Sequence, residues 1–90
     1  MKYLLFYESA DNVVERGAPH LAGHSARLRE FHARGDLLLV GPLENPQENG
    51  ALSVFRTREA AEEFAGGDPF VRHGVVKNWY VRAWDEILTP

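Results

Sequence analysis

Residues 36–56 read DLLLVGPL, then ENPQENG, then ALSVFR. The two outer runs, residues 36–43 and 51–56, are rich in apolar side chains and are bounded by turn-forming residues, which predicts two strands. The middle run is polar, and its Asn49-Gly50 pair favours a tight turn with a positive φ angle. Because seven residues are too few for a crossover connection, the two strands are predicted to pair antiparallel.

The segment before this strand pair, residues 20–34, has a helical period. Six residues recur at the spacing of one helix face, namely Leu21, His24, Ser25, Leu28, Phe31 and His32. Gly35 follows as a stop signal, and Arg34 in the last turn suits the helix dipole. Residues 8–19 are polar and turn-like, and Pro19 at their end suits the first turn of the helix.

The two ends of the chain complete the pattern. Residues 3–7, YLLFY, predict a first strand, and residues 75–84, VVKNWYVRAW, predict a last one. Between the third strand and the last, Thr57 is placed to cap a helix, and Gly66-Gly67 is placed to end it. The order β-α-β-β-α-β over residues 1–90 predicts one α+β domain, a sandwich of the ferredoxin-like plan.

Composition and charge narrow the class of protein. The chain has 90 residues, a formal net charge of −3 and no cysteine, so it lacks the basic surface of a nucleic-acid module and every thiolate-based site. Its apolar runs are much shorter than the ~20 residues that span a bilayer. The opening residues do not have the pattern of a signal peptide. We therefore expect a cytoplasmic domain that binds neither nucleic acid nor membrane.

The predicted strands are apolar on both faces, although two helices can cover only one face of the sheet. In residues 75–84, for example, simple alternation places Val75, Trp79 and Val81 on one face and Val76 and Tyr80 on the other. An open sheet face of this kind exceeds the apolar patches usual on monomers. We expect a homodimer packed sheet to sheet and burying at least ~1,000 Å² in total. The alternative is a loop or terminal segment that folds over this face.

His24 and Asp68 are the strongest candidates for chemistry. His24 interrupts an apolar helical stripe, and Pro69 holds Asp68 in an extended conformation. Taken singly, His24 suits a hydrogen-bonded core residue and Asp68 suits a helix cap. The fold returns the chain from the second helix to a strand beside the first, close to one end of the first helix. There Asp68 can hold one ring nitrogen of His24 and leave the other as a general base.

Other residues are weaker candidates. Arg27, one turn from His24, is placed either to bind an anionic substrate or to lie in solvent. His20 and His24 have the spacing of a two-histidine metal site without an identified third ligand, and we predict no metal. Tyr7, Phe70 and Trp79 are candidate pocket walls and, with Arg27, candidate substrate-binding residues.

The whole chain resembles the YCII-related (YciI-like) family. The matching features are the opening Tyr3–Tyr7 strand, His24 followed by Leu28, His32 and Gly35, the Gly41-Pro42-Leu43 segment, the alanine-rich second helix, Asp68-Pro69-Phe70 with Gly74, and a last strand ending near Trp84. The resemblance implies a dimeric α/β barrel with a His–Asp pair in a cleft, here His24 and Asp68. It also implies activity on small cyclic or aromatic molecules, including lyase-type removal of halide from hydroxylated rings. Several relatives carry an arginine where this chain has Leu21, which favours an apolar substrate here.

Two functions follow from these observations. The first is a small-molecule enzyme without a cofactor, in which His24 abstracts a proton and Asp68 orients it, with a reaction of the lyase, isomerase or dehalogenase type. The second is a non-catalytic ligand-binding or accessory dimerisation domain, in which His24 is a core residue and Asp68 a cap.

Overall fold

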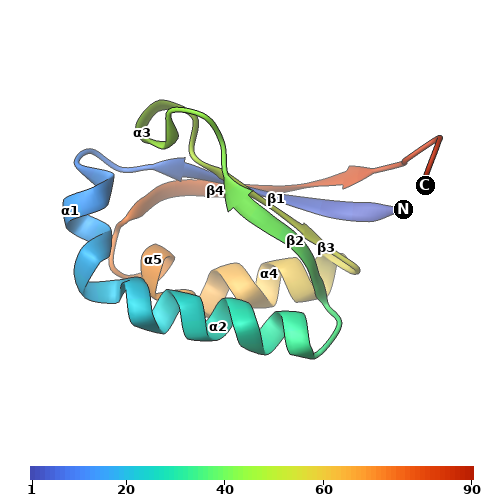
Figure 1. The fold of residues 1–90 in the computed structure, drawn as a ribbon, viewed down its shortest axis with the longest axis horizontal. Coiled ribbons are helices and arrows are strands. Elements are labelled where there is room, and N and C mark those ends of the chain that lie inside the picture. Colours follow the sequence, from blue (N-terminus) through green and yellow to red (C-terminus); the bar gives the residue numbers. More distant parts are fainter.

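The computed structural model describes all 90 residues and consists of a four-stranded antiparallel sheet with helices (Figure 1). The strands are β1 (Lys2–Ser9), β2 (Leu37–Pro42), β3 (Ala51–Phe55) and β4 (Val76–Trp84). The helices are α1 (Val13–Gly17), the 3-10 helix η1 (Ala18–His20), α2 (Leu21–Ala33), α3 (Pro46–Asn49), α4 (Arg58–Gly67) and α5 (Pro69–Arg72). The predicted α+β class is confirmed.

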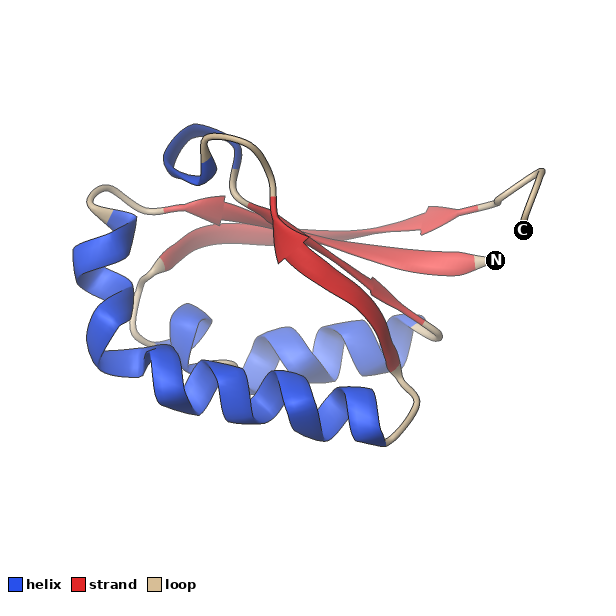
Figure 2. Ribbon diagram, viewed as in Figure 1, coloured by secondary structure: helices blue, strands red, loops and turns tan.

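The strand order is β2-β3-β1-β4, and every neighbouring pair is antiparallel. The predicted antiparallel pairing of β2 with β3 is confirmed, as is the position of β4 beside β1. Helices α2, α4 and α5 lie along one face of the sheet, and no long helix covers the opposite face (Figure 2). Two of the sequence signals for helix ends are also confirmed. Thr57 accepts a hydrogen bond from the Ala60 amide, and Gly35 has a φ of 82°.

The turn-like assignment of residues 8–19 was wrong in part, because α1 lies within this region and η1 begins in it. The local sequence gives this region a weak helical signal, and a tertiary contact supports it. Gln47 accepts a hydrogen bond from the Val13 amide at 2.9 Å and donates one to the Ala10 carbonyl at 2.8 Å. The predicted loop of residues 44–50 likewise contains a single helical turn, α3, with Pro46 at its start.

The assignment of faces along β4 also needs a correction. Simple alternation would place Val76 on the same face as Tyr80, away from the helices. A register shift puts Val76 opposite Ser9, whereas Asn78 lies opposite Glu8. Val76 is therefore buried in the core. A β-bulge of this kind is set by strand pairing and does not follow from the period of one strand.

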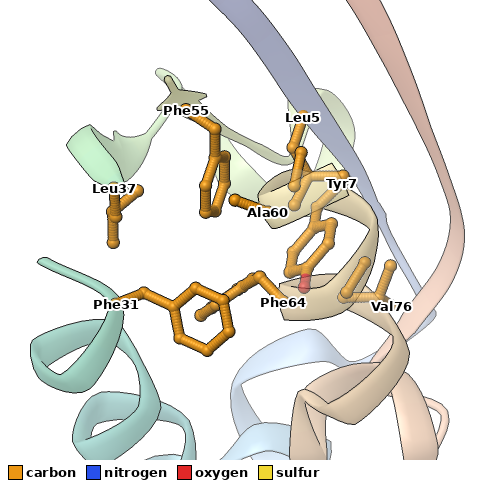
Figure 3. Packing of buried hydrophobic residues seen from close by; sticks show 10 residues of the cluster. Leu5, Tyr7, Phe31, Leu37, Phe55, Ala60, Phe64 and Val76 are labelled. Carbon is orange, nitrogen blue, oxygen red and sulfur yellow. The ribbon is translucent and has the colours of Figure 1, made fainter. Parts of the chain in front are cut away.

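The core lies between the sheet and helices α2 and α4, and aromatic rings dominate it (Figure 3). Phe31 of α2 meets Phe55 of β3 and Phe64 of α4 edge to face, with ring centroids 6.4 and 5.2 Å apart. Alanines on α4 allow this helix to approach the sheet closely. A close backbone contact borders the core, since a Cβ on Gly50 would overlap the Tyr7 carbonyl oxygen. The packing thus fixes β1, α2 and α4 against one another.

The two ends of the chain lie at the same end of the molecule (Figure 1). Glu86, just after β4, accepts a hydrogen bond from Lys2 at 2.9 Å and lies 3.1 Å from the amino terminus. No helix of the structure is both long enough and apolar enough to cross a bilayer.

Candidate active site

The structure brings His24 and Asp68 together. His24 lies in the first half of α2, and Asp68 lies at the junction where α4 ends and α5 begins. The Nδ1 atom of His24 is 2.9 Å from Oδ1 and 3.0 Å from Oδ2 of Asp68. Asp68 has the extended backbone predicted from Pro69, with φ −70° and ψ 125°. The contact thus joins residues that are 44 positions apart in the sequence.

The Asp68 carboxylate has three hydrogen-bond partners, and each of them can donate. The Tyr7 hydroxyl donates to Oδ2 at 2.6 Å, and the Phe70 amide donates to Oδ1 at 3.0 Å. An ionised carboxylate only accepts, so this set of partners suits the charged form of Asp68. Neutral His24 must then carry its proton on Nδ1 to donate as well. This tautomer leaves Nε2 with a free lone pair and no partner within the protein.

Asp68 is fully buried, with 0% of its surface exposed. A buried carboxylate is stable only when its lone pairs are satisfied, which the three donors achieve. The same arrangement acts on Tyr7. Burial, followed by the charge of Asp68 and the hydrogen bond to it, raises the pKa of the Tyr7 phenol far above its ordinary value. Tyr7 is therefore a neutral donor throughout the physiological range.

Two aromatic rings fix the plane of the His24 imidazole. Phe70 stacks on it at a centroid distance of 3.8 Å and an interplanar angle of 6°, and Phe64 contacts its edge at 6.4 Å. Asp68 caps α5 through the Phe70 amide, so one carboxylate positions both the ring of His24 and the ring that covers it. The arrangement presents one free ring nitrogen in a defined orientation.

A cavity of about 440 Å³ lies beside His24, within the range usual for small-molecule sites. Helix α2 forms one wall and the edge of the sheet formed by β2 and β3 forms the other. Its lining consists of Leu21, His24, Ser25 and Leu28 from α2, Val40, Gly41 and Pro42 from β2, Ala51, Leu52 and Ser53 from β3, and Tyr7, Phe64 and Phe70. No lysine, arginine, aspartate or glutamate is among these residues, so the cavity is apolar apart from a few neutral polar groups.

The predicted pocket residues divide into two groups. Tyr7 and Phe70 line the cavity, whereas Arg27 and Trp79 do not. Arg27 donates to the carbonyls of Glu63 and Phe64, at 2.8 and 3.1 Å, near the end of α4. Its guanidinium is thereby committed to a structural contact between α2 and α4. Arg27 is accordingly not among the residues that line this cavity, and its contact with a substrate stays a prediction.

Trp79 lies opposite Tyr7 in β4 and packs against the core, and it is not among the residues that line the cavity. The two histidines with metal-site spacing also have separate partners. His20 stacks on His73 at a centroid distance of 4.1 Å, whereas His24 is held by Asp68. No cluster of three or more potential metal ligands occurs in the structure.

The cavity lining also includes two serines that were not among the predicted site residues. Ser25 follows His24 on the helix, and Ser53 lies in β3. Ser53 is the only polar residue among the five of that strand, ALSVF, and this is the one sequence feature that could have indicated a site there. A single serine in a strand is too common to identify a site without the pairing partners that place it.

Comparison with known proteins agrees with the sequence resemblance. The YCII-related domain matches residues 1–85. The chain belongs to the YCII-related domain family. Its relatives in this family include an uncharacterised protein of Haemophilus influenzae, 30% identical, with 98% of this chain and 100% of that protein covered. The protein YciI of Escherichia coli O6:H1 is 28% identical over the same shares of the two chains.

A solved structure has the same fold as this YCII-related chain. It is 5-chloro-2-hydroxyhydroquinone dehydrochlorinase from Burkholderia phenoliruptrix, in complex with 2,5-dihydroxybenzoquinone. The two chains superpose with a TM-score of 0.74 over 94% of each, at 18% sequence identity. At this level of identity the similarity establishes the fold alone.

Proposed function

We propose that this YCII-related protein is a small-molecule enzyme of the lyase type, in which His24 is the general base and Asp68 orients it. The observation that carries the proposal is the 2.9 Å contact between His24 Nδ1 and a fully buried Asp68 beside a cavity of about 440 Å³. A structural histidine needs neither a cavity next to it nor a free second nitrogen. General bases require both, together with a fixed orientation.

The proposed reaction begins with proton transfer to Nε2 of His24. The electron pair of the broken bond forms a new double bond in the substrate, and a leaving group departs with the electrons of its own bond. The imidazolium formed on His24 is stabilised by the Asp68 carboxylate, and its proton then passes to the leaving group or to water. Because these transfers balance protons and electrons, the reaction requires no redox cofactor.

The cavity indicates the substrate class. Its walls are mainly apolar and include the rings of Phe64 and Phe70, so we propose that a flat ring packs there. The dehydrochlorinase of the same fold acts on a chlorinated, hydroxylated ring, as its name states. We therefore propose a hydroxylated cyclic or aromatic substrate, with halide as one leaving group to test.

The test uses 5-chloro-2-hydroxyhydroquinone as the first substrate and measures chloride release. His24→Gln is expected to lower the rate by about 10²–10⁴-fold, which is the usual contribution of a positioned general base. Asp68→Asn is expected to lower it as well, with a change in the pH profile. Wild-type rates in His24→Gln would refute the assignment.

The alternative function is a non-catalytic ligand-binding or accessory domain. The observation in its favour is that Asp68 caps α5 through the Phe70 amide, which is a structural role. If His24→Gln and Asp68→Asn lowered only the melting temperature and left ligand binding and any turnover unchanged, this second function would be favoured over catalysis by His24.

We further propose that two copies of the chain pack sheet to sheet and form a dimeric α/β barrel. The sheet face opposite the helices carries Leu4, Phe6, Leu39, Leu52 and Tyr80, as the strand register places them. Leu39 is 69% exposed in the single chain, and Phe6 stacks on Tyr80 at 5.1 Å. Covering this face with a second copy would remove an apolar patch from water.

Light scattering tests the dimer. We expect about twice the 10.2 kDa mass of the single chain at micromolar concentration. Phe6→Glu is expected to shift the protein to the monomer, because it places a charge at the centre of the proposed interface. A wild-type particle of monomer mass would refute the dimer.

A further inference from the structure

Ser53 has an uncommon environment for a serine. It is 6% exposed, and it and Asp68 are the two polar residues of the chain that are buried. The carboxylate of Asp68 has three hydrogen-bond donors around it. The hydroxyl of Ser53 makes no hydrogen bond within the protein, although the residue lines the cavity. The Ser53 oxygen is not among the side-chain atoms that are fully buried without a partner, so it keeps access to the cavity and is free to bind a ligand there.

The strand register places Ser53 opposite His24 across the cavity. Ser53 pairs with Leu5 of β1 and with Val40 of β2, and directly paired residues lie on the same face of a sheet. Leu5 belongs to the core under the helices, so Ser53 also faces the helix layer. His24 lines the same cavity from α2. A ring held between these walls would have the base on one side and the serine hydroxyl on the other.

The charge of the cavity limits what the serine can bind. None of the lining residues is a lysine or an arginine, and the guanidinium of Arg27 is engaged by the carbonyls of α4. A carboxylate or phosphate on the ligand would therefore be buried without a counter-charge, which is unfavourable. A neutral hydroxyl or carbonyl oxygen needs only one hydrogen bond, and Ser53 can provide it as donor or as acceptor.

We propose that Ser53 is the specificity-determining residue of this site and holds a neutral oxygen on the side of the ligand away from His24. The inference rests on the proposed function only in placing the ligand in this cavity. The inference narrows the proposed substrate class to uncharged rings with oxygens at two opposite positions. One oxygen or its neighbouring carbon faces His24, and the other meets Ser53.

The test compares hydroquinone, which has two opposite hydroxyls, with phenol, which has one. Affinities are measured by NMR titration of the full-length protein, without turnover. Wild type is expected to bind hydroquinone about tenfold more tightly than phenol, the effect of one hydrogen bond in a buried site. Ser53→Ala is expected to bind both rings with the affinity of phenol. Ser53→Cys, which keeps the side-chain volume with a weak donor, provides a second variant should the alanine protein fold poorly.

Two controls separate this inference from the catalytic proposal. Ser25→Ala removes the other free hydroxyl of the cavity and is expected to keep the preference for hydroquinone. His24→Gln is also expected to keep a preference that Ser53→Ala abolishes, whatever its effect on chloride release. A preference that survives in both Ser53 variants would overturn the inference while leaving the role of His24 intact. Wild-type protein that binds neither ring, or binds both equally, would overturn it as well.

Discussion

Replacing Tyr7 with phenylalanine removes one hydroxyl from the group of donors around Asp68 and leaves the aromatic ring in place. The lost contact is the 2.6 Å hydrogen bond from the Tyr7 hydroxyl to Oδ2 of Asp68. Its acceptor is fully buried, so water cannot replace the missing donor without entering the core. His24 and the Phe70 amide remain as partners of the carboxylate.

The magnitude of the effect follows from the charge of the acceptor. A hydrogen bond to a charged group contributes about 1.5–3 kcal/mol to the free energy of unfolding. For a domain of this size each kcal/mol shifts the melting temperature by roughly 4–8 °C, so Tyr7→Phe is expected to lower it by roughly 6–24 °C.

Thermal unfolding followed by circular dichroism measures this shift, and the chain offers a matched control. The hydroxyl of Tyr3 lies in an exposed contact with the Met1 sulfur at 3.7 Å, so Tyr3→Phe is expected to leave the melting temperature unchanged. If Tyr7→Phe melts no lower than Tyr3→Phe, the hydroxyl does not support the buried carboxylate, and the reasoning about the protonation of the site fails.

Two further predictions concern the end of α4 and the C-terminal segment. A Cβ at Gly66 would have no atom within 4 Å, so Gly66→Ala is expected to stabilise the helix by roughly 0.5–1 kcal/mol. A Cβ at Gly67 would instead collide with Nη2 of Arg27. Chemical denaturation should give Gly67→Ala a lower free energy of unfolding than Gly66→Ala. Equal free energies would mean that the Arg27 contact does not contribute to stability. The hydrogen bond from Lys2 lowers the pKa of Glu86 from 4.5 to about 2, so its stabilising contribution is present above pH 4.5 and is lost as the pH falls toward 2. Amide hydrogen exchange of residues 85–90 over this range should follow that loss in wild type but not in Glu86→Gln, and a segment equally protected at both ends of the range would contradict the assignment.

Local sequence signals predicted most of the secondary structure because they depend on neighbouring residues. The stripe of residues 20–34, the cap at Thr57 and the turn before β3 each act within a few positions of the chain. The helix α1 was missed because part of its support comes from Gln47, more than 30 residues away. The face of Val76 was wrong for a similar reason, since a bulge between β1 and β4 reverses it.

The same distinction between local signals and tertiary contacts applies to the residues of the candidate site. His24 could be selected from sequence because an imidazole in an apolar helical stripe is unusual, and Asp68 because proline follows it. The hydrogen bonds from Arg27 to the α4 carbonyls could not be predicted, because they form only where α2 and α4 pack against each other. The position of Ser53 opposite the helix wall depends on its pairing with Leu5 and Val40, which no single strand specifies.

The order of the four strands and the two long helices, the family and the two candidate catalytic side chains can therefore be obtained from the amino acids alone, because periodicity, capping and residue chemistry are local properties. The meeting of Tyr7, His24 and Asp68 in one hydrogen-bonded group is a property of the tertiary structure. These residues come from β1, α2 and the end of α4, and they touch only after the sheet has set its strand order and the helices have packed against one face. Burial then removes water, and the donors around the carboxylate determine which nitrogen of His24 remains free.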